Sequence, residues 1–343
     1  MTPNVAEALR VMASRQPLPR ALAEAAFGDL MDGRATEAQK GAILLGIAAR
    51  GETAGEIAGA VEALRRRMRR VVTRRAPLLD TCGPGGLGRD LFNLSTAAAI
   101  VAAGAGAAVA KHGNRSISSR VGSADVLSAS GVGIELEPDE AGRILDEVGL
   151  VFLFAPSFHP AMRELGTVRR ELGIRTIFNA LGPLANPAGA TRQLIGVGRA
   201  ELVGLLADAL VSLGTEGAIV FHSANGLDEL VPGVPASGIE IRDGARRPWT
   251  LEAAGLRQAP VALEELRGGD AAENAAMLGR LLEGERGPRR EAVLLNAAAA
   301  LYVEGRARDL AEGGERARDS VDSGRAADVF HRLKAAGTPR VSA

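Results

Sequence analysis

The sequence predicts an α/β protein, with a small helical N-terminal domain over residues 1–72 and a larger domain over residues 77–340 that has a mostly parallel sheet flanked by helices. Up to Val72, apolar residues recur every three or four positions without an alternating segment, which indicates helices. After Pro77, short apolar runs alternate with helical stretches, which is typical of parallel strands joined by helices. A length of 343 residues fits this division into two domains.

The N-terminal region is expected to hold four helices. Two of them have clear starts, because Thr36 followed by Gln39 and Thr53 followed by Glu56 form capping boxes. The last helix ends in a basic run, at Arg65, Arg66, Arg67, Arg69 and Arg70. A nucleic-acid site is one interpretation of this run, but no aromatic residues accompany it and cations favour a helix C-terminus, so we expect a structural role.

The larger domain is expected to alternate strands and helices. Strands are predicted at residues 78–79, 107–110, 133–136, 151–154, 176–178, 193–197, 218–221 and 239–242. Helices are predicted at residues 95–105, 124–130, 160–173, 292–303 and 326–336. The helical segment 160–173 is expected to pack on the N-terminal helices.

Composition excludes several classes of partner. The 41 basic and 41 acidic side chains give a net charge of zero, so no overall field favours nucleic acid or a membrane. The first residues lack the apolar core of a signal peptide, and no apolar run is of membrane-spanning length without interruption. Cys82 is the only cysteine, which excludes an internal disulfide and a multi-cysteine zinc site. A cytoplasmic location is expected.

A glycine-rich loop follows the first predicted strand. Residues 83–88 read Gly-Pro-Gly-Gly-Leu-Gly and contain a GxGxxG pattern. The dinucleotide fingerprint also requires an acidic residue about twenty positions later, and none is present there. The loop is therefore interpreted as a turn whose backbone amides approach a phosphate, with a turn that only reverses the chain as the alternative.

Polar residues also mark the start of the next helix and the end of the next strand. Asn93, Ser95 and Thr96 would place side-chain oxygens and free backbone N–H groups at the positive end of a helix, where pyrophosphate binds well, although Ser95 or Thr96 could simply be an N-cap. Lys111 to Arg115 follow a buried strand, at the sheet edge where α/β proteins bind ligands, and Ser116, Ser118 and Ser119 extend this cluster. A solvated polar loop is the alternative for the cluster.

Acidic and basic groups suggest a metal and a carboxylate. Asp228 and Glu229 follow another predicted strand and suit Mg²⁺ bridged to phosphate, with a helix start as the alternative. A guanidinium at Arg169 could bind a carboxylate, whereas Arg170 is expected to pair with a surface acid. His159 and His222 are expected to be packed loop histidines.

Several segments resemble, in content and order, those of the anthranilate phosphoribosyltransferase family over nearly the whole chain. They are KHGNRSISS, GSADVL, FAPSFHPAM, VRRELGIRTIFNALGPLANPA, GLDEL and LNAAAALYVEG. The resemblance implies a larger domain of the nucleoside-phosphorylase type, a homodimer and a need for Mg²⁺. It also implies transfer of the phosphoribosyl group from phosphoribosyl pyrophosphate to the amine of anthranilate, in tryptophan biosynthesis.

The resemblance also implies site residues. Phosphoribosyl pyrophosphate would bind at Gly83, Gly86, Leu87, Leu91, Asn93, Leu94, Ser95, Thr96, Lys111, His112, Gly113, Asn114, Arg115, Ser116, Ile117, Ser118, Ser119 and Ser123. Mg²⁺ would bind at Ser95, Asp228 and Glu229, and anthranilate at Gly83, His112, Asn114, Arg169 and Pro183. No residue is expected to act as an acid or base, because an aromatic amine is already a nucleophile; Lys111, His112 and Arg169 would position the reactants.

The glycine loop departs from the family pattern, which usually reads Gly-Thr-Gly-Gly-Asp-Gly. Pro84 and Leu87 replace the threonine and the aspartate, and Leu91 and Val121 replace a common threonine and a frequent serine. Proline removes a backbone donor and leucine removes a carboxylate, so diphosphate binding could be weakened or reshaped. A related transferase or phosphorylase with another acceptor, or a non-catalytic relative, therefore stays open as an alternative.

Overall fold

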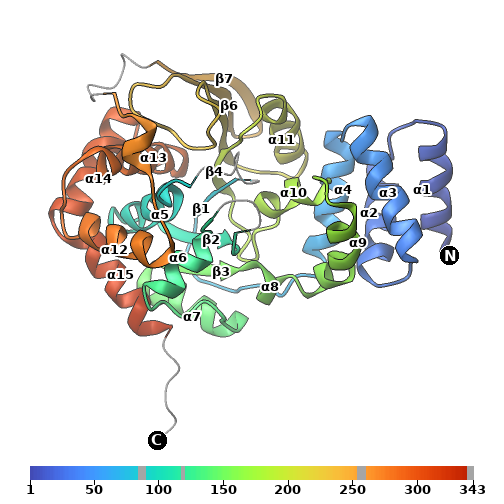
Figure 1. Ribbon diagram of the computed structural model, residues 1–343, viewed down its shortest axis with the longest axis horizontal. Helices are drawn as coiled ribbons and strands as arrows, with labels where there is room; N and C mark the ends of the chain where they lie inside the picture. The colour runs from blue at the N-terminus through green and yellow to red at the C-terminus, as the bar shows by residue number, and fades with distance from the viewer. Residues whose placement is uncertain (84–89, 117–119, 253–259, 338–343) are drawn as a thin grey trace, which may run out of the picture.

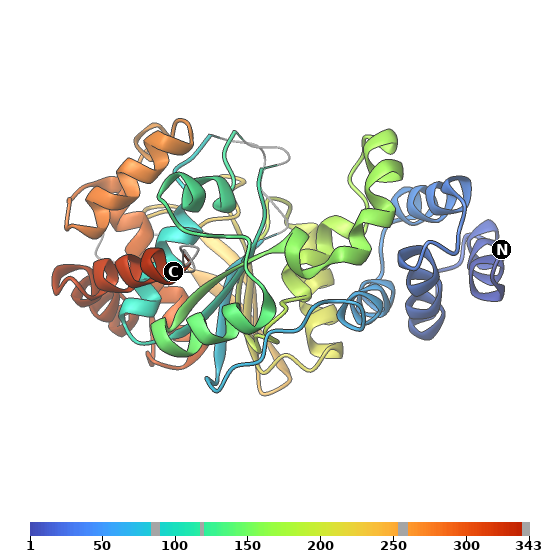
Figure 2. The same ribbon diagram turned by 90° about the horizontal axis from the view of Figure 1, so that it is seen from below.

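The computed structural model describes residues 1–83, 90–116, 120–252 and 260–337, and it confirms the predicted α/β fold (Figure 1). Figure 2 shows a helical N-terminal part at one end of an elongated molecule and the α/β part at the other. The N-terminal helices are α1 (Pro3–Ala13), α2 (Arg20–Met31), α3 (Glu37–Arg50) and α4 (Ala54–Arg65). Both predicted capping boxes are confirmed, at the starts of α3 and α4.

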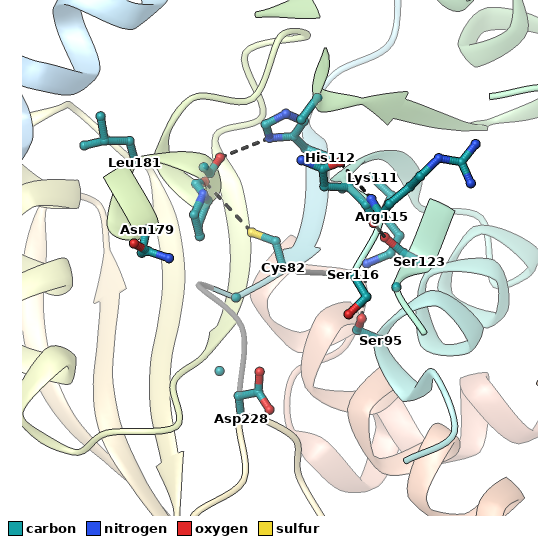
Figure 3. A pocket seen from close by; sticks show the side chains of 18 of the residues that line it. Cys82, Ser95, Lys111, His112, Arg115, Ser116, Ser123, Asn179, Leu181 and Asp228 are labelled. Atoms are coloured by element: carbon teal, nitrogen blue, oxygen red, sulfur yellow. Dashed lines mark hydrogen bonds between the residues drawn. The ribbon is translucent and has the colours of Figure 1, made fainter. Parts of the chain in front are cut away.

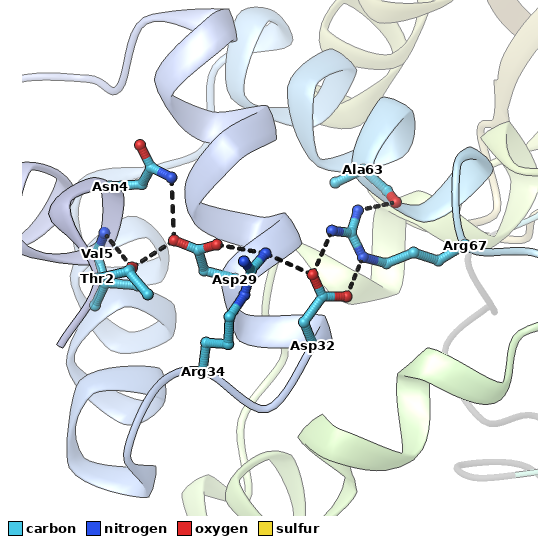
Figure 4. Close-up of polar contacts among 8 residues, drawn as sticks. All are labelled: Thr2, Asn4, Val5, Asp29, Asp32, Arg34, Ala63 and Arg67. Atoms are coloured by element: carbon cyan, nitrogen blue, oxygen red, sulfur yellow. Dashed lines mark hydrogen bonds and ion pairs between the residues drawn. The ribbon is translucent and has the colours of Figure 1, made fainter.

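Buried and half-buried ion pairs connect the N-terminal helices (Figure 4). The buried carboxylate of Asp29 accepts hydrogen bonds from Thr2 and Asn4 and forms an ion pair with Arg34 at 2.8 Å. Asp32 accepts two hydrogen bonds from the guanidinium of Arg67, at 2.6 and 2.7 Å. Arg67 is one of the arginines of the basic run, so this part of the run has the structural role that we expected.

A seven-stranded sheet forms the centre of the larger part, in the order β3-β2-β1-β4-β5-β6-β7. The first five strands in the chain are parallel, and β6 and β7 are antiparallel additions at one edge. The strands are β1 (Leu78–Cys82), β2 (Ala108–Gly113), β3 (Leu150–Phe154), β4 (Arg192–Gly196), β5 (Gly217–Ser223), β6 (Ala236–Arg242) and β7 (Ala245–Leu251).

The two faces of the sheet belong to two apolar cores, because side chains alternate along a strand. On β4 and β5, Leu194 and Ile219 face a core shared with the C-terminal helices, whereas Ile195 and Val220 face a core shared with the N-terminal helices. The second core therefore runs without interruption from the helical part to the sheet. It fixes the helical part against the face on which α10 and α11 lie (Figure 1).

The remaining helices cover these faces and build the connections. They are α5 (Leu94–Gly104), α6 (Ser123–Ala129), α7 (Pro138–Val148), α8 (Ala155–Phe158), α9 (Gly166–Leu172), α10 (Phe178–Leu181), α11 (Glu201–Ser212), α12 (Ala271–Leu282), α13 (Pro288–Glu304), α14 (Leu310–Asp322) and α15 (Arg325–Ala336). Short 3-10 helices span Pro160–Leu165, Gly182–Leu184 and Leu263–Leu266. The segment from Pro160 to Leu172 packs against α2 and α3. Within the described ranges, no helix is long and apolar enough to cross a membrane.

Two predicted strands are wrong. Residues 133–136 form no strand, and the alternating burial of Val132, Ile134 and Leu136 arises because this segment packs under the end of α15. Residues 176–178 lead into α10, since Asn179 caps the turn by accepting a hydrogen bond from the Thr176 backbone at 3.0 Å. Strand β7 was not predicted, and neither were α7, α11, α12 and α14 as separate helices.

Candidate active site

A cavity of about 1090 Å³ opens at the carboxyl ends of the parallel strands (Figure 3). Its wall is built from the ends of β1, β2, β4 and β5, the first turn of α5, and the segment from α8 to the 3-10 turn at Pro183. Parallel strands point their carboxyl ends to one edge of a sheet, which is why residues far apart in the sequence meet here.

The first turn of α5 presents Asn93 and Ser95 to the cavity. Asn93 is the N-cap, with its Oδ1 accepting a hydrogen bond from the Thr96 backbone at 3.3 Å, so the alternative in which Ser95 or Thr96 is only the N-cap is wrong. Leu94 and Thr96 are buried, and their side chains do not belong to the described cavity wall. Asn274 on α12 fixes the cap, since its Oδ1 accepts a hydrogen bond from the Asn93 backbone at 3.0 Å.

Lys111 lies buried between β1 and α5. Its Nζ donates to the Thr81 carbonyl at 2.5 Å and to Ser95 Oγ at 3.3 Å. Burial lowers the pKa of this ammonium, and the neighbouring Asp80 carboxylate opposes the shift. Lys111 therefore connects the end of β1 to the start of α5 and contributes positive charge to the buried part of the cavity wall.

Two histidines pack together on the cavity wall. His112 Nδ1 lies 3.0 Å from the Gly182 carbonyl, and because a carbonyl only accepts, this nitrogen carries the proton. His112 Nε2 is then an acceptor, and it has no partner among the described residues. The ring of His159 lies 5.0 Å from that of His112, and burial together with His112 lowers the pKa of His159 to about 3.

The remaining histidine of the sequence predictions, His222, has a structural contact. It is half-buried at the end of β5, where its Nδ1 donates to the Val197 carbonyl at 2.8 Å. It is therefore a packed histidine, as expected. His159 is also packed, but unlike His222 it forms part of the cavity wall.

Asp125, which the sequence analysis did not identify, shapes the polar loop after β2. Its carboxylate forms an ion pair with Arg115 at 2.9 Å and accepts hydrogen bonds from the Ser116 and Gly122 backbones at 3.1 and 2.9 Å. These contacts tie Arg115 and Ser116 to the start of α6, and Gly113, Asn114, Arg115, Ser116 and Ser123 all line the cavity. An acid in the first turn of a predicted helix was the signal available in the sequence.

Asp228 and Glu229 lie on the loop after β5, and no helix begins there, so the helix-start alternative is wrong. Both are half-buried. Burial raises the pKa of both carboxyls, that of Glu229 to about 8; for Glu229 the neighbouring Asp228 adds to the shift and Lys111 opposes it. A Cβ on Gly83 would lie 3.7 Å from Asp228 Oδ2, which places the start of the glycine loop beside this pair.

The two acids are the only paired carboxylates on the described part of the cavity wall. In the described ranges, no three His, Cys, Asp or Glu side chains come together as a metal site. Two carboxylates with Ser95 nearby leave most coordination positions for water and phosphate, which is the arrangement that Mg²⁺ prefers.

Arg169 faces the cavity from α9. The Arg169 Cζ lies 5.4 Å from the centre of the Phe178 ring, and within the described ranges the guanidinium has no carboxylate partner. Burial lowers its pKa. The surface acid expected for Arg170 is not found among the described residues; Arg170 is exposed and lines the same cavity.

Other predicted site residues have mixed outcomes. Pro183 lines the cavity, and its carbonyl accepts a hydrogen bond from Gln193 at 2.5 Å. Leu91 and Val121 also line it and pack against the core of the C-terminal helices. Pro84, Gly86, Leu87, Ile117, Ser118 and Ser119 lie outside the described residues.

Comparison with known proteins gives matches over nearly the whole chain. Residues 75–327 match the model of the glycosyl transferase family a/b domain, and residues 6–68 match that of its helical bundle domain. The chain is 48% identical over 336 residues to the anthranilate phosphoribosyltransferase of Anaeromyxobacter dehalogenans, with 97% of this chain and 99% of the relative covered. It is 51% identical over 313 residues to that of Thermomicrobium roseum, with 90% of each chain covered.

Solved structures agree with these matches. The structure is similar to the crystal structure of anthranilate phosphoribosyltransferase from Thermus thermophilus, with a TM-score of 0.89, 44% identity, and 96% of this chain and 99% of that chain covered. A Saccharomyces cerevisiae structure at 24% identity shares the fold, with a TM-score of 0.88 and 97% of each chain covered. The chain belongs to the anthranilate phosphoribosyltransferase family.

Proposed function

We propose that this chain transfers the phosphoribosyl group of phosphoribosyl pyrophosphate to the amine of anthranilate and releases pyrophosphate, as a step of tryptophan biosynthesis. Family membership at 48% and 51% identity supports this activity. The observation that carries it is one cavity that combines a helix start, a carboxylate pair and an arginine that has no carboxylate partner among the residues the structure describes. Each of these groups suits one part of the two substrates.

The donor substrate is proposed to bind at the first turn of α5. Asn93 and Ser95 line the cavity there, and the positive end of the helix dipole favours the negative diphosphate. The loop that Asp125 organises would cover the ribose phosphate through Asn114, Ser116 and Ser123. The other donor-site residues inferred from the family resemblance are proposed to act here as well.

Mg²⁺ is proposed to bind at Asp228 and Glu229, with Ser95 nearby. Two half-buried like charges favour a bound cation, because each raises the energy of the other's ionised form. A bound Mg²⁺ would neutralise charge on the departing pyrophosphate. The Saccharomyces cerevisiae protein of the same fold is described in complex with phosphoribosyl pyrophosphate and Mg, which agrees with this assignment.

Anthranilate is proposed to bind between Arg169 and His112. The Arg169 guanidinium, which lies over the Phe178 ring, can donate two hydrogen bonds to the acceptor's carboxylate. His112 Nε2 can accept a hydrogen bond from the amine and so direct the nitrogen lone pair towards the anomeric carbon. Gly83, Asn114 and Pro183 complete the proposed acceptor site, and the rate enhancement would come from positioning.

The test follows anthranilate fluorescence with phosphoribosyl pyrophosphate and Mg²⁺. The wild-type protein is expected to consume anthranilate, and Arg169→Ala is expected to raise the KM for anthranilate about 10- to 100-fold while the donor KM stays near its original value. Arg169→Lys keeps the positive charge but cannot form the bidentate pair of hydrogen bonds to a carboxylate, so an intermediate KM for anthranilate is expected. No turnover by the wild-type protein beside an active relative would contradict the proposal and favour a different acceptor or a non-catalytic relative.

We also propose a cytoplasmic homodimer. Leu45 on α3 is 50% exposed and Ile174, just after α9, is 45% exposed, and these two helices pack together. Exposed large apolar side chains on adjacent elements favour a subunit contact. Light scattering should give a dimer mass for the wild-type protein and a monomer mass for Leu45→Glu.

The helical domain is proposed to comprise residues 1–72 together with helices near residues 160–173, and the α/β domain is proposed to comprise residues 77–340.

A further inference from the structure

We propose that Asn296 and Ser223 are positioning residues that hold the backbone of Glu229 and Leu230, and thereby fix where the carboxylates of Asp228 and Glu229 point. This inference rests on the proposed function, since it matters only if the acids bind Mg²⁺ with the donor substrate. Neither side chain has been given a role above. Asn296 lies in the segment LNAAAALYVEG, one of those that carry the family resemblance.

Asn296 uses its whole amide to hold one residue of the acidic loop. Its Oδ1 accepts a hydrogen bond from the Leu230 N–H at 3.1 Å, and its Nδ2 donates to the Leu230 carbonyl at 2.8 Å. The second Nδ2 hydrogen reaches the Ala292 carbonyl of its own helix at 2.8 Å. Because the N–H and the carbonyl of Leu230 are both fixed by one rigid amide, the backbone at Leu230 cannot rotate without losing both bonds.

Ser223 holds the same loop from the side of the sheet. It is the last residue of β5 and is fully buried, and its Oγ donates to the Glu229 carbonyl at 2.7 Å. The loop is also pressed against β4, since a Cβ on Gly196 would lie 1.7 Å from the Asp228 carbonyl oxygen. The backbone of each of the three residues from Asp228 to Leu230 is therefore fixed by a different neighbour.

The apolar surroundings of Asn296 indicate that its hydrogen bonds to Leu230 have more than a packing role. Asn296 is 2% exposed, and its neighbours on α13, including Val293, Leu295 and Ala299, belong to the apolar core. A polar side chain in such a helix is unfavourable unless its hydrogen bonds are made, and here two of the three are made to the loop that carries the acids. Two neighbouring carboxylates repel each other when ionised, so a rigid backbone is needed to keep them at one cation.

The experiment compares two variants with a matched control. Ser223→Ala removes a buried hydroxyl that donates to the Glu229 carbonyl, and Asn296→Ala removes the amide. Ser320→Ala is the control, because Ser320 is also fully buried and its Oγ donates to a backbone carbonyl, that of Val101, at a comparable 2.8 Å. Val101 lies in the second half of α5, away from the first turn that lines the cavity.

The primary measurement is calorimetric binding of phosphoribosyl pyrophosphate at increasing Mg²⁺, without acceptor and therefore without turnover. We expect the Mg²⁺ concentration for half-maximal binding to rise about tenfold in Asn296→Ala and about threefold in Ser223→Ala, as the loss of hydrogen bonds of ordinary strength predicts. Ser320→Ala should keep the wild-type value, and the KM for anthranilate should stay within about twofold in all three. The midpoint temperature of thermal unfolding should fall by similar amounts in Ser223→Ala and Ser320→Ala.

Each other outcome is decisive. Equal Mg²⁺ requirements in Ser223→Ala and Ser320→Ala would overturn the proposal, and so would an equal rise in the KM for anthranilate, because a general loss of structure would explain either. If Asn296→Ala does not fold, the serine pair decides the question alone. Wild-type protein whose donor binding does not depend on Mg²⁺ would instead contradict the proposed metal site, so the two failures can be told apart.

Discussion

Replacing His159 with glutamine is expected to make the protein less sensitive to acid. The pKa of His159 falls from its ordinary 6.5 to about 3 in the folded protein, because the ring is buried and faces His112. Below pH 6.5 the unfolded chain binds a proton that the folded chain does not bind, so the free energy of unfolding decreases as the pH falls towards 3. At pH 5 this difference amounts to about 2 kcal/mol, and glutamine removes it.

Urea unfolding at several pH values from about 8 to about 5 measures the effect. The difference in unfolding free energy between the wild-type protein and His159→Gln should change by about 2 kcal/mol in favour of the variant as the pH falls. His331→Gln on the exposed face of α15 controls for the replacement itself. Parallel pH curves for the wild-type protein and His159→Gln would refute the reasoning, since they would mean that His159 takes up its proton equally in the folded and unfolded states.

Three further substitutions test other parts of the structure. Thr53→Ala removes the cap of α4 and should lower the free energy of unfolding by about 1 kcal/mol in urea; an unchanged value would contradict the capping role. Asp125→Asn should raise the KM for phosphoribosyl pyrophosphate about tenfold by releasing the loop after β2, whereas an equal rise in the KM for anthranilate would argue against a donor-side role. Gly196→Ala would place a Cβ 1.7 Å from the Asp228 carbonyl oxygen, so steady-state assays should show a lower kcat and a higher Mg²⁺ requirement in protein whose circular dichroism is unchanged, and wild-type kinetics would contradict the close packing.

The fold was predictable where one physical signal dominated. Helical periodicity with capping residues defined the N-terminal helices, and buried apolar runs defined the parallel strands. Prediction failed where burial had another cause. Residues 133–136 alternate because one side packs under α15, and β7 was missed because an edge strand tolerates the charges and the proline of ARRPWTL.

The site residues at strand ends were predictable from the sequence, but the residues that hold the site in place through hydrogen bonds were not. Lys111 and Asp228 reach one cavity because parallel strands end at one edge, a rule that needs only the strand order. Asn274 and Asn296 lie on helices near the end of the chain, and nothing in their local sequence indicates which loop they hold. Long-range hydrogen bonds of this kind depend on the tertiary packing, so a single sequence does not encode them locally.

The charges on the cavity wall indicate why the proposed reaction should depend strictly on a divalent cation. Of the lysines and arginines on the described wall, Lys111 and Arg115 lie at the end of β2 and after it, Arg175 interacts with the Asp228 carboxylate, and the other three lie between residues 163 and 170. Lys111 already donates to Thr81 and Ser95, and Arg115 is paired with Asp125. Little positive charge therefore remains for a diphosphate, whose charge must be neutralised before it can leave. Chelation should accordingly abolish turnover rather than reduce it, and substantial activity in excess chelator would mean that α5 and its neighbours suffice.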